Sequence, residues 1–114
     1  MSDKQEQSDE FLQLHLEQTE QKYLDELENI NDEYNKIIIL NKLGNLFTKV
    51  DIDKSIDYFK KAAKLGSIDD EYYCGLCYIE KSKLYKSKDP EKEQNLRKVA
   101  KDCFQAAAEK DHKK

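Results

Sequence analysis

The apolar residues of this chain recur at spacings of three, four and seven positions, which is the pattern of helices that each bury one face. The first stripe of this kind consists of Leu12, Leu16, Tyr23, Leu27 and Ile30. Ser8 or Asp9 is suited to cap the start of a helix there, whereas the polar residues 1–7 favour a disordered tail. The pattern therefore predicts a first amphipathic helix over residues 8–28.

Four further helices are predicted, with a short tail at 111–114 after them. They cover residues 32–49, 52–65, 68–87 and 90–110. Their boundaries follow from cap and turn residues, since Asp32 suits a helix start, Gly66 a helix end and Pro90 the first turn of the last helix. The first boundary has an alternative, because isolated asparagines such as Asn29 do not forbid one helix that continues into the next segment.

Turn-forming residues are too scarce for a sheet protein of this length, since the chain contains 3 glycines and 1 proline. We therefore expect a single all-α domain over residues 8–110. The longest apolar run, Ile37 to Leu40, is far shorter than the roughly 18 residues of a membrane span. Because the first residues also lack the features of a signal peptide, we expect no membrane insertion and a cytoplasmic location, with the nucleus or an organelle as alternatives.

Two parts of the chain resemble each other. The segment Leu43 to Phe47 is similar to Cys74 to Tyr78, and Phe59 to Ala63 is similar to Phe104 to Ala108, so two helix pairs can be superposed. A glycine inside a helix costs about 1 kcal/mol relative to alanine. The central glycine of each first segment is therefore expected at a point of tight helix packing.

The two helix pairs differ in length. Gly44 and Phe59 are 15 positions apart, whereas Gly75 and Phe104 are 29 positions apart, so the second pair contains 14 additional residues. Fourteen residues form about four helical turns. We expect them to lengthen both helices of the second pair, because a structureless loop of that size is uncommon within a domain.

One stretch of the chain resembles the Sel-one-like repeat family, a branch of the tetratricopeptide-like helical repeats. The matching positions are Phe59, Ala62, Ala63, Gly66, Gly75 and Tyr78. The chain departs from the family pattern at Cys74, which replaces leucine, at Asp111, which replaces the terminal glycine of the second copy, and in the short link after Phe47. The resemblance implies an α-α superhelix of two antiparallel helix pairs, preceded here by the additional helix over residues 8–28.

Proteins of that family act as adaptors, and their first helices line a groove for a peptide or a partner helix. The resemblance implies that the groove of this chain is lined by Asn41, Asn45, Thr48, Tyr72, Leu76 and Ile79. The amides of Asn41 and Asn45 lie one turn apart and could hold an extended peptide backbone. In the alternative interpretation, both asparagines are merely solvated and Tyr72 caps the core. Replacing both asparagines by alanine is expected to weaken partner capture without unfolding the chain.

The favoured function is therefore a protein–protein interaction module, either an adaptor or a small scaffold subunit. An obligate structural subunit of a larger complex is the alternative, because two units are fewer than the three that a repeat stack normally needs. Catalysis is not expected, since no glycine-rich phosphate loop occurs and no histidine lies at a motif spacing from a serine or cysteine. No cofactor is expected either.

Cysteine use offers a third class of function. Cys74 and Cys77 have the spacing of half a zinc site, but only Cys103, His15 and His112 remain to complete it. Buried free thiols are the favoured interpretation, because an odd number of cysteines without a secretory signal argues against a disulfide framework. A thiol or metal-binding protein acting through Cys74 and Cys77 remains the less favoured alternative.

Charge is distributed unevenly along the chain. Residues 1–33 contain 11 acidic residues and 2 lysines, whereas the remainder contains 13 acidic and 18 basic residues. This asymmetry allows the acidic first helix to lie against a basic face of the repeats. Eight basic residues gather at Lys81, Lys83, Lys86, Lys88, Lys92, Arg97, Lys98 and Lys101. Acidic residues interrupt that cluster and it holds a single arginine, so we expect a solvated helix face and no nucleic-acid binding.

Overall fold

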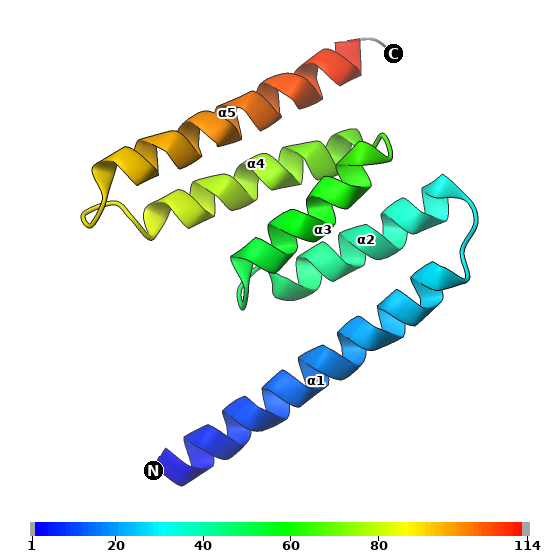
Figure 1. Cartoon of the computed structure of the whole chain (residues 1–114), viewed down its shortest axis with the longest axis vertical. Helices are drawn as coiled ribbons and strands as arrows, with labels where there is room; N and C mark the ends of the chain where they lie inside the picture. Colours follow the sequence, from blue (N-terminus) through cyan, green and yellow to red (C-terminus); the bar gives the residue numbers. More distant parts are fainter. Residues whose placement is uncertain (1, 113–114) are drawn as a thin grey trace.

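The computed structural model describes residues 2–112, and the side chains of residues 9–112. Five helices account for most of this range, and it contains no strand (Figure 1). The helices are α1 (Ser2–Glu28), α2 (Glu33–Phe47), α3 (Ile52–Lys64), α4 (Ile68–Lys83) and α5 (Pro90–His112). Each helix packs against the next one along the chain. The all-α fold expected from the sequence is confirmed.

Four of the helix starts are set by side-chain caps. The capping residues each accept a hydrogen bond from the backbone N–H three residues further along, and they are Asp32, Asp51, Ser67 and Asp89. The cap at Asp32 separates α1 from α2, so the alternative of one continuous helix through this region is wrong. Gly66 ends α3 with a positive φ of 107°, a conformation that a glycine adopts without steric cost.

Some helix ends differ from the expected ones. The first helix begins at Ser2, whereas a disordered tail was expected over residues 1–7, because residues 2–8 contain no glycine or proline that would end it. Met1 and residues 113–114 lie outside the described residues. At its other end, α5 continues to His112, past the expected end at residue 110.

The end of α4 also differs from the expected one. It stops at Lys83 and not at residue 87, because the backbone turns there. The N–H groups of Lys88 and Asp89 both donate to the carbonyl of Tyr85, at 3.2 and 3.0 Å. The polar residues between Leu84 and Asp89 therefore form the link to α5.

Each helix pair closes around one contact between a glycine and an aromatic ring. A Cβ atom placed on Gly44 would lie 2.5 Å from the nearest ring carbon of Phe59. A Cβ atom placed on Gly75 would lie at the same distance from a ring carbon of Phe104. Because side-chain atoms do not approach so closely, any side chain at either position would require the facing ring to move. The tight packing expected at both glycines is confirmed.

The core consists of two clusters that meet at α3. The first lies between α1, α2 and α3 and is formed by Leu16, Ile39, Leu40, Leu43, Phe47, Tyr58 and Ala62. The second lies between α3 and α4 and is formed by Ile56, Phe59, Cys74 and Cys77. Since α3 contributes side chains to both clusters, it joins the first helix pair to the second.

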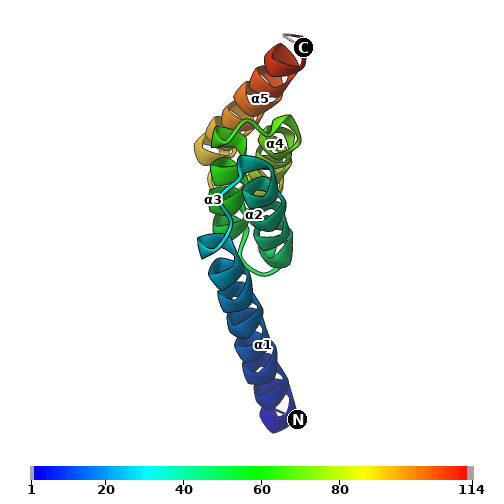
Figure 2. The same cartoon turned by 90° about the vertical axis from the view of Figure 1, so that its right-hand side faces the viewer.

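The second helix pair is longer than the first. Beyond its glycine, α4 continues for eight residues, whereas α2 continues for three. Before its phenylalanine, α5 has fourteen residues, whereas α3 has seven. Most of the additional residues therefore lengthen the helices, and the α4–α5 pair projects past the α2–α3 pair (Figure 1). The molecule is also thin, with Cα extents of 54 × 44 × 13 Å (Figure 2).

The C-terminal half of α1 is attached to the repeats by apolar and charged contacts. Leu16 is buried in the first core cluster. One turn later, the Glu20 carboxylate accepts hydrogen bonds from the Tyr58 hydroxyl and from Lys54 Nζ, the latter at 2.8 Å. Burial acts to raise the pKa of Glu20, but the hydrogen bonds from Lys54 and Tyr58 outweigh it and hold that pKa below its ordinary value. This side of the acidic helix therefore does lie against a lysine of the repeats.

Replacing Gly44 by alanine should lower the free energy of unfolding, because the new methyl group meets the buried Phe59 ring. Overpacking of this kind costs about 1–3 kcal/mol, which outweighs the gain of at most about 1 kcal/mol from better helix propensity. Gly75→Ala should cost less, since Phe104 is only half-buried and its ring can shift. Urea unfolding of Gly44→Ala, Gly75→Ala and Gly44→Ala/Phe59→Leu measures these free energies. Equal free energies of unfolding for the three variants would contradict the proposed contact.

Tyr58→Phe should lower the free energy of unfolding by about 1 kcal/mol at neutral pH, because it removes the hydroxyl that donates to Glu20. The pKa of Glu20 is depressed in the folded chain, so its stabilisation is present above the ordinary value of 4.5 and is lost as the pH falls through the folded value. The difference between the two chains should therefore narrow at low pH in urea titrations. Tyr34→Phe, on an exposed tyrosine, is the control and should change little.

Candidate protein-binding face

An apolar surface remains exposed along α4. Tyr72, Tyr73 and Leu76 are all exposed, and their spacing of one, three and four places them on one side of the helix. Large apolar side chains scattered singly on a surface are normal, but three adjacent ones form a patch. We call this patch, together with the residues of α2 and α5 that line cavities with it, the α2–α4 face.

Three cavities lie along the α2–α4 face, and Tyr73 contributes to the wall of all three. One cavity, which we call the middle cavity because it lies beside the middle of α4, has a volume of about 210 Å³ and extends to the end of α2. Cavities of about 530 and 600 Å³ adjoin each other at the start of α4, the first beside the start of α2 and the second beside α5. The face is therefore hollowed at three points around one tyrosine.

Five of the six residues expected to line a groove are distributed over these cavities. Three of them, Asn45, Thr48 and Leu76, line the middle cavity together. Asn41 lines the 530 Å³ cavity and Tyr72 the 600 Å³ cavity. Ile79 is half-buried and lines none of the three cavities.

Sequence reasoning missed Tyr73 as a site residue. Tyr73 precedes Leu76 by three positions and therefore lies on the same side of α4. That spacing was the available signal. Its ring also lies 5.5 Å from the ring of Phe59, between centroids. Tyr73 therefore connects the exposed face to the phenylalanine that packs on Gly44.

A second aromatic contact supports the other end of the patch. The ring centroids of Tyr72 and Phe104 are 5.3 Å apart, and those of Tyr72 and Tyr73 are 6.3 Å apart. Tilted rings at these separations attract one another beyond their shared burial. Both exposed tyrosines thus rest on the phenylalanines of the two glycine contacts, which restricts their motion.

Asn41 has a structural role, because its side chain links two helices by hydrogen bonds. Its Nδ2 donates to Oδ1 of the buried Asp70 at 2.8 Å, while its own Oδ1 accepts from Asn45 at 2.9 Å. The second carboxylate oxygen of Asp70 accepts from the Ser67 hydroxyl. Asn41 therefore ties α2 to the start of α4, and its amide is already engaged.

Asn45 and Thr48 are freer than Asn41 to meet a ligand. Asn45 is exposed, and its side-chain carbonyl accepts no hydrogen bond within the described part of the chain. The Thr48 hydroxyl donates to the Asn45 backbone carbonyl at 3.2 Å and keeps its acceptor lone pairs. The middle cavity thus combines apolar walls with accessible polar groups.

Cys74 and Cys77 are buried on α4, where Cys77 forms part of the wall of the 210 Å³ cavity, and Cys103 is half-buried on α5. Burial is the largest cause that raises the pKa of Cys74 to about 12 and of Cys77 to about 11, so both are protonated thiols at neutral pH. Burial also raises the pKa of Cys103. In residues 9–112, no three cysteine, histidine or acidic side chains are placed to hold a metal ion. The geometry does not favour the thiol or metal alternative.

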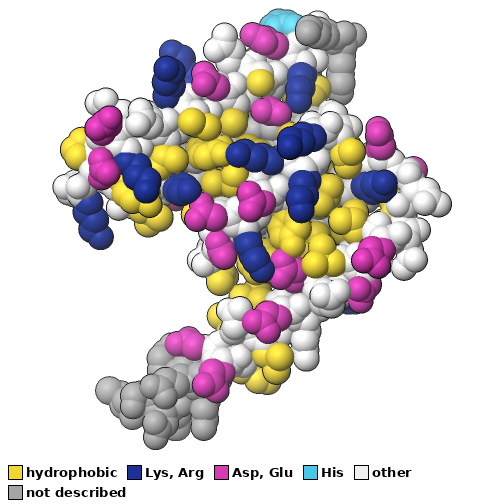
Figure 3. All heavy atoms as spheres, in the orientation of Figure 1, with side chains coloured by type: hydrophobic (Ala, Val, Ile, Leu, Met, Phe, Trp, Pro, Cys, Tyr) yellow, Lys and Arg dark blue, Asp and Glu magenta, His cyan; other side chains and the backbone are white. Residues whose placement is uncertain are grey.

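The cluster of basic residues is mixed with acids on the surface (Figure 3). Lys81 Nζ lies 2.6 Å from Asp53 Oδ1, Lys83 Nζ lies 2.9 Å from Glu80 Oε1, and Arg97 pairs with Glu93. These pairs reduce the positive charge that a polyanion would meet. None of the helices within residues 2–112 has an apolar stretch long enough to span a bilayer.

Comparison of the chain with protein-family models, curated proteins and solved structures gave no significant match. The resemblance to Sel-one-like repeats therefore stays a prediction, based on the spacing from Phe59 to Tyr78. The fold and the α2–α4 face rest on the structure itself.

Asn41→Ala should lower the free energy of unfolding by about 1–3 kcal/mol, because the buried Asp70 carboxylate loses a hydrogen-bond donor. Asn45→Ala should change it by no more than about 0.5 kcal/mol, as expected for an exposed side chain. Chemical denaturation of the two single variants checks this difference. Equal free energies of unfolding for the two variants would contradict the structural role of Asn41. If the difference is found, the joint replacement of Asn41 and Asn45 by alanine changes stability as well as binding, so it does not test binding alone.

Proposed function

We propose that the chain is a protein–protein interaction module that holds a peptide or a partner helix on its α2–α4 face. The observation that carries this proposal is the patch of Tyr72, Tyr73 and Leu76, which stays exposed beside three cavities. Exposed apolar patches lined by cavities are characteristic of sites where another chain is bound.

The size of the middle cavity favours a side chain as its occupant. Sites for small molecules usually enclose about 300–1,000 Å³, whereas this cavity has about 210 Å³. Its walls are apolar at Leu76 and Tyr73, and polar groups of Asn45 and Thr48 stand at its edge. An apolar side chain of the partner would fill the cavity while those polar groups bind the adjacent backbone.

The face is also suitably rigid for recognition. The patch residues are on one helix, and the phenylalanines beneath them are held against Gly44 and Gly75. A binding surface that is already ordered avoids part of the entropy cost of association. This supports reversible capture by an adaptor, in agreement with the family resemblance. In the alternative, an obligate subunit, the same face would be covered permanently.

A peptide selection tests the proposal directly. Peptides selected from a random library on the native chain should bind at least about tenfold more weakly to Tyr73→Ala/Leu76→Ala, because two central apolar contacts are lost. Isothermal titration calorimetry measures the dissociation constants, and circular dichroism verifies the helical content of each variant.

Val99→Ala is the matched control for that experiment. Val99 is 38% exposed, close to the 37% of Tyr73, but it lies on α5 and lines none of the three cavities. Its replacement should leave the affinity unchanged. Selected peptides that bind the double variant as tightly as the native chain would refute the assignment of this face.

A further inference from the structure

The 600 Å³ cavity of the α2–α4 face has aromatic walls. It lies between the start of α4 and the end of α5, and its three rings belong to Tyr72, Tyr73 and Phe104. Both tyrosines are exposed, and Tyr72 is 48% exposed, so much of its ring remains accessible from solvent. The faces of aromatic rings are electron-rich and attract cations. The cavity therefore offers a surface that suits a positively charged group.

Two carboxylates add negative charge to the same cavity. Asp69 from the first turn of α4 and Asp111 from the last turn of α5 both line it, and both are exposed. Neither forms an ion pair within the described part of the chain. The neighbouring Lys110 is paired with Glu71 and lines a different cavity. Because no basic side chain of residues 9–112 lines the 600 Å³ cavity, its negative charge is not compensated there.

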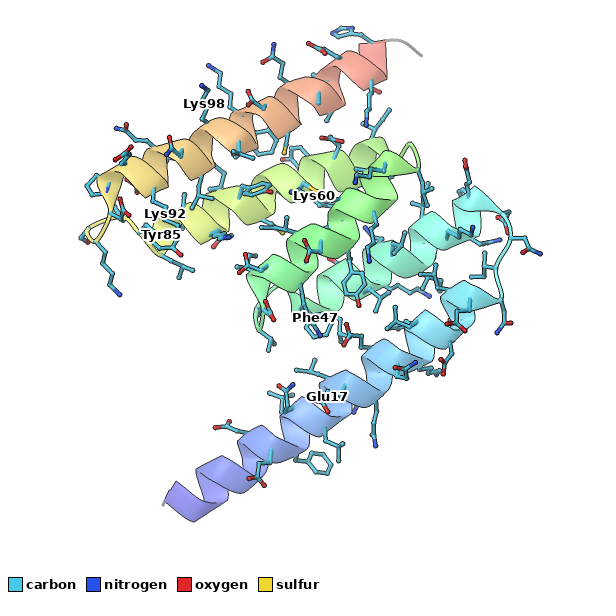
Figure 4. All side chains as sticks on the ribbon, in the orientation of Figure 1. Glu17, Phe47, Lys60, Tyr85, Lys92 and Lys98 are labelled. Carbon is cyan, nitrogen blue, oxygen red and sulfur yellow. The ribbon has the colours of Figure 1, made fainter. Side chains whose placement is uncertain are left out.

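Other aromatic rings of the chain are matched with its own lysines. Lys92 Nζ lies 4.4 Å from the ring centroid of Tyr85 (Figure 4). Lys54 Nζ lies 4.7 Å from the ring centroid of Phe47, and two further tyrosine rings have a lysine at 5.4 and 5.5 Å. Among the described residues, no such pair involves a ring of the 600 Å³ cavity. These rings are therefore available to a cation from another molecule.

The guanidinium group of arginine is the protein cation that suits this cavity best. It is planar and stacks on aromatic faces, and its fork of N–H donors matches the geometry of carboxylates. The ammonium group of lysine is a compact point charge and lacks both properties. Pockets that enclose a ligand usually measure about 300–1,000 Å³, and the cavity of about 600 Å³ lies within that range. It therefore has room for the long side chain of arginine.

We propose that the 600 Å³ cavity binds an arginine side chain of the partner through the tyrosine rings and the carboxylates of Asp69 and Asp111. This inference rests on the proposed function, because the arginine belongs to the peptide or helix that the α2–α4 face holds. Tyr73 lines both this cavity and the middle one, so one segment of the partner can reach both. The 530 Å³ cavity is less suitable for a cation, since Lys42 lines it.

The peptides selected on the native chain give the first test of this proposal. They should be enriched in arginine, whereas binding through apolar contacts alone would produce no enrichment. In the tightest-binding peptide, exchange of the enriched arginine for citrulline removes the charge but keeps the length and planarity of the side chain. This exchange should raise the dissociation constant at least about tenfold, and exchange for lysine should raise it at least about threefold.

Neutralising the two carboxylates gives the sharper test. Asp69→Asn/Asp111→Asn should bind the arginine peptide at least about tenfold more weakly than the native chain, because the shape is kept and the charge is lost. With this variant, the exchange of arginine for citrulline should cost less than about threefold, since the two changes remove the same interaction. Isothermal titration calorimetry measures these affinities, and circular dichroism verifies the helical content of each variant.

Asp57→Asn/Asp102→Asn is the matched control. It removes the same number of exposed carboxylates, but neither residue lines a cavity of the α2–α4 face. Its affinity for the arginine peptide should equal that of the native chain. A loss as large as that of Asp69→Asn/Asp111→Asn would show an effect of net charge alone and would overturn the assignment of the arginine to this cavity.

Three further results would overturn the arginine site. They are selected peptides without arginine enrichment, a citrulline or lysine peptide that binds the native chain as tightly as the arginine peptide, and an unchanged affinity for Asp69→Asn/Asp111→Asn. Peptides that lose affinity for Tyr73→Ala/Leu76→Ala but keep it for the aspartate variant would refute the arginine site alone. Failure to select any peptide would refute the proposed function and the arginine site together, so the two failures are distinguishable.

Discussion

The contact between a glycine and a phenylalanine ring, made once in each helix pair, is the constraint on which the remaining structure depends. It sets how closely α2 approaches α3 and how closely α4 approaches α5, because the ring of Phe59 lies directly against Gly44 and the ring of Phe104 lies directly against Gly75. The same two rings then support Tyr73 and Tyr72 from below. The exposed face is therefore a product of core packing, and its shape follows from two positions where the chain has no Cβ.

Polar contacts also fix the positions of the helices relative to one another. The Asp70 carboxylate is buried, and it is stabilised there by Asn41 from α2 and by the Ser67 cap of its own helix. Such a network has strict geometry, because each partner must lie at the correct distance and angle. It therefore fixes the angle between α2 and α4, on which the cavities between them depend. The bond from Tyr58 to Glu20 has the same role for α1.

Much of this architecture could be read from the sequence, for reasons that are local. Caps such as Asp32, the turn at Gly66 and the spacing of apolar residues act within one or two helical turns, so they are visible in a linear pattern. The role of Asn41 was not visible, because it depends on Asp70, 29 positions away. Tyr73 could have been found from its spacing to Leu76, but its contact with Phe59, 14 positions earlier, is not visible in a linear pattern. Half of the groove residues implied by the family resemblance, namely Asn45, Thr48 and Leu76, do share one cavity.

The order of packing along the chain also has a kinetic consequence. Since each helix is stabilised mainly by its neighbours in sequence, most contacts form between segments that are never far apart, and the relative contact order is low. Chains of this kind fold rapidly, by adding one hairpin to another from a starting nucleus. The terminal helix α1 has neighbours on one side only, so it can detach while α2 to α5 stay folded, and its amide protons will exchange with solvent before those of α3.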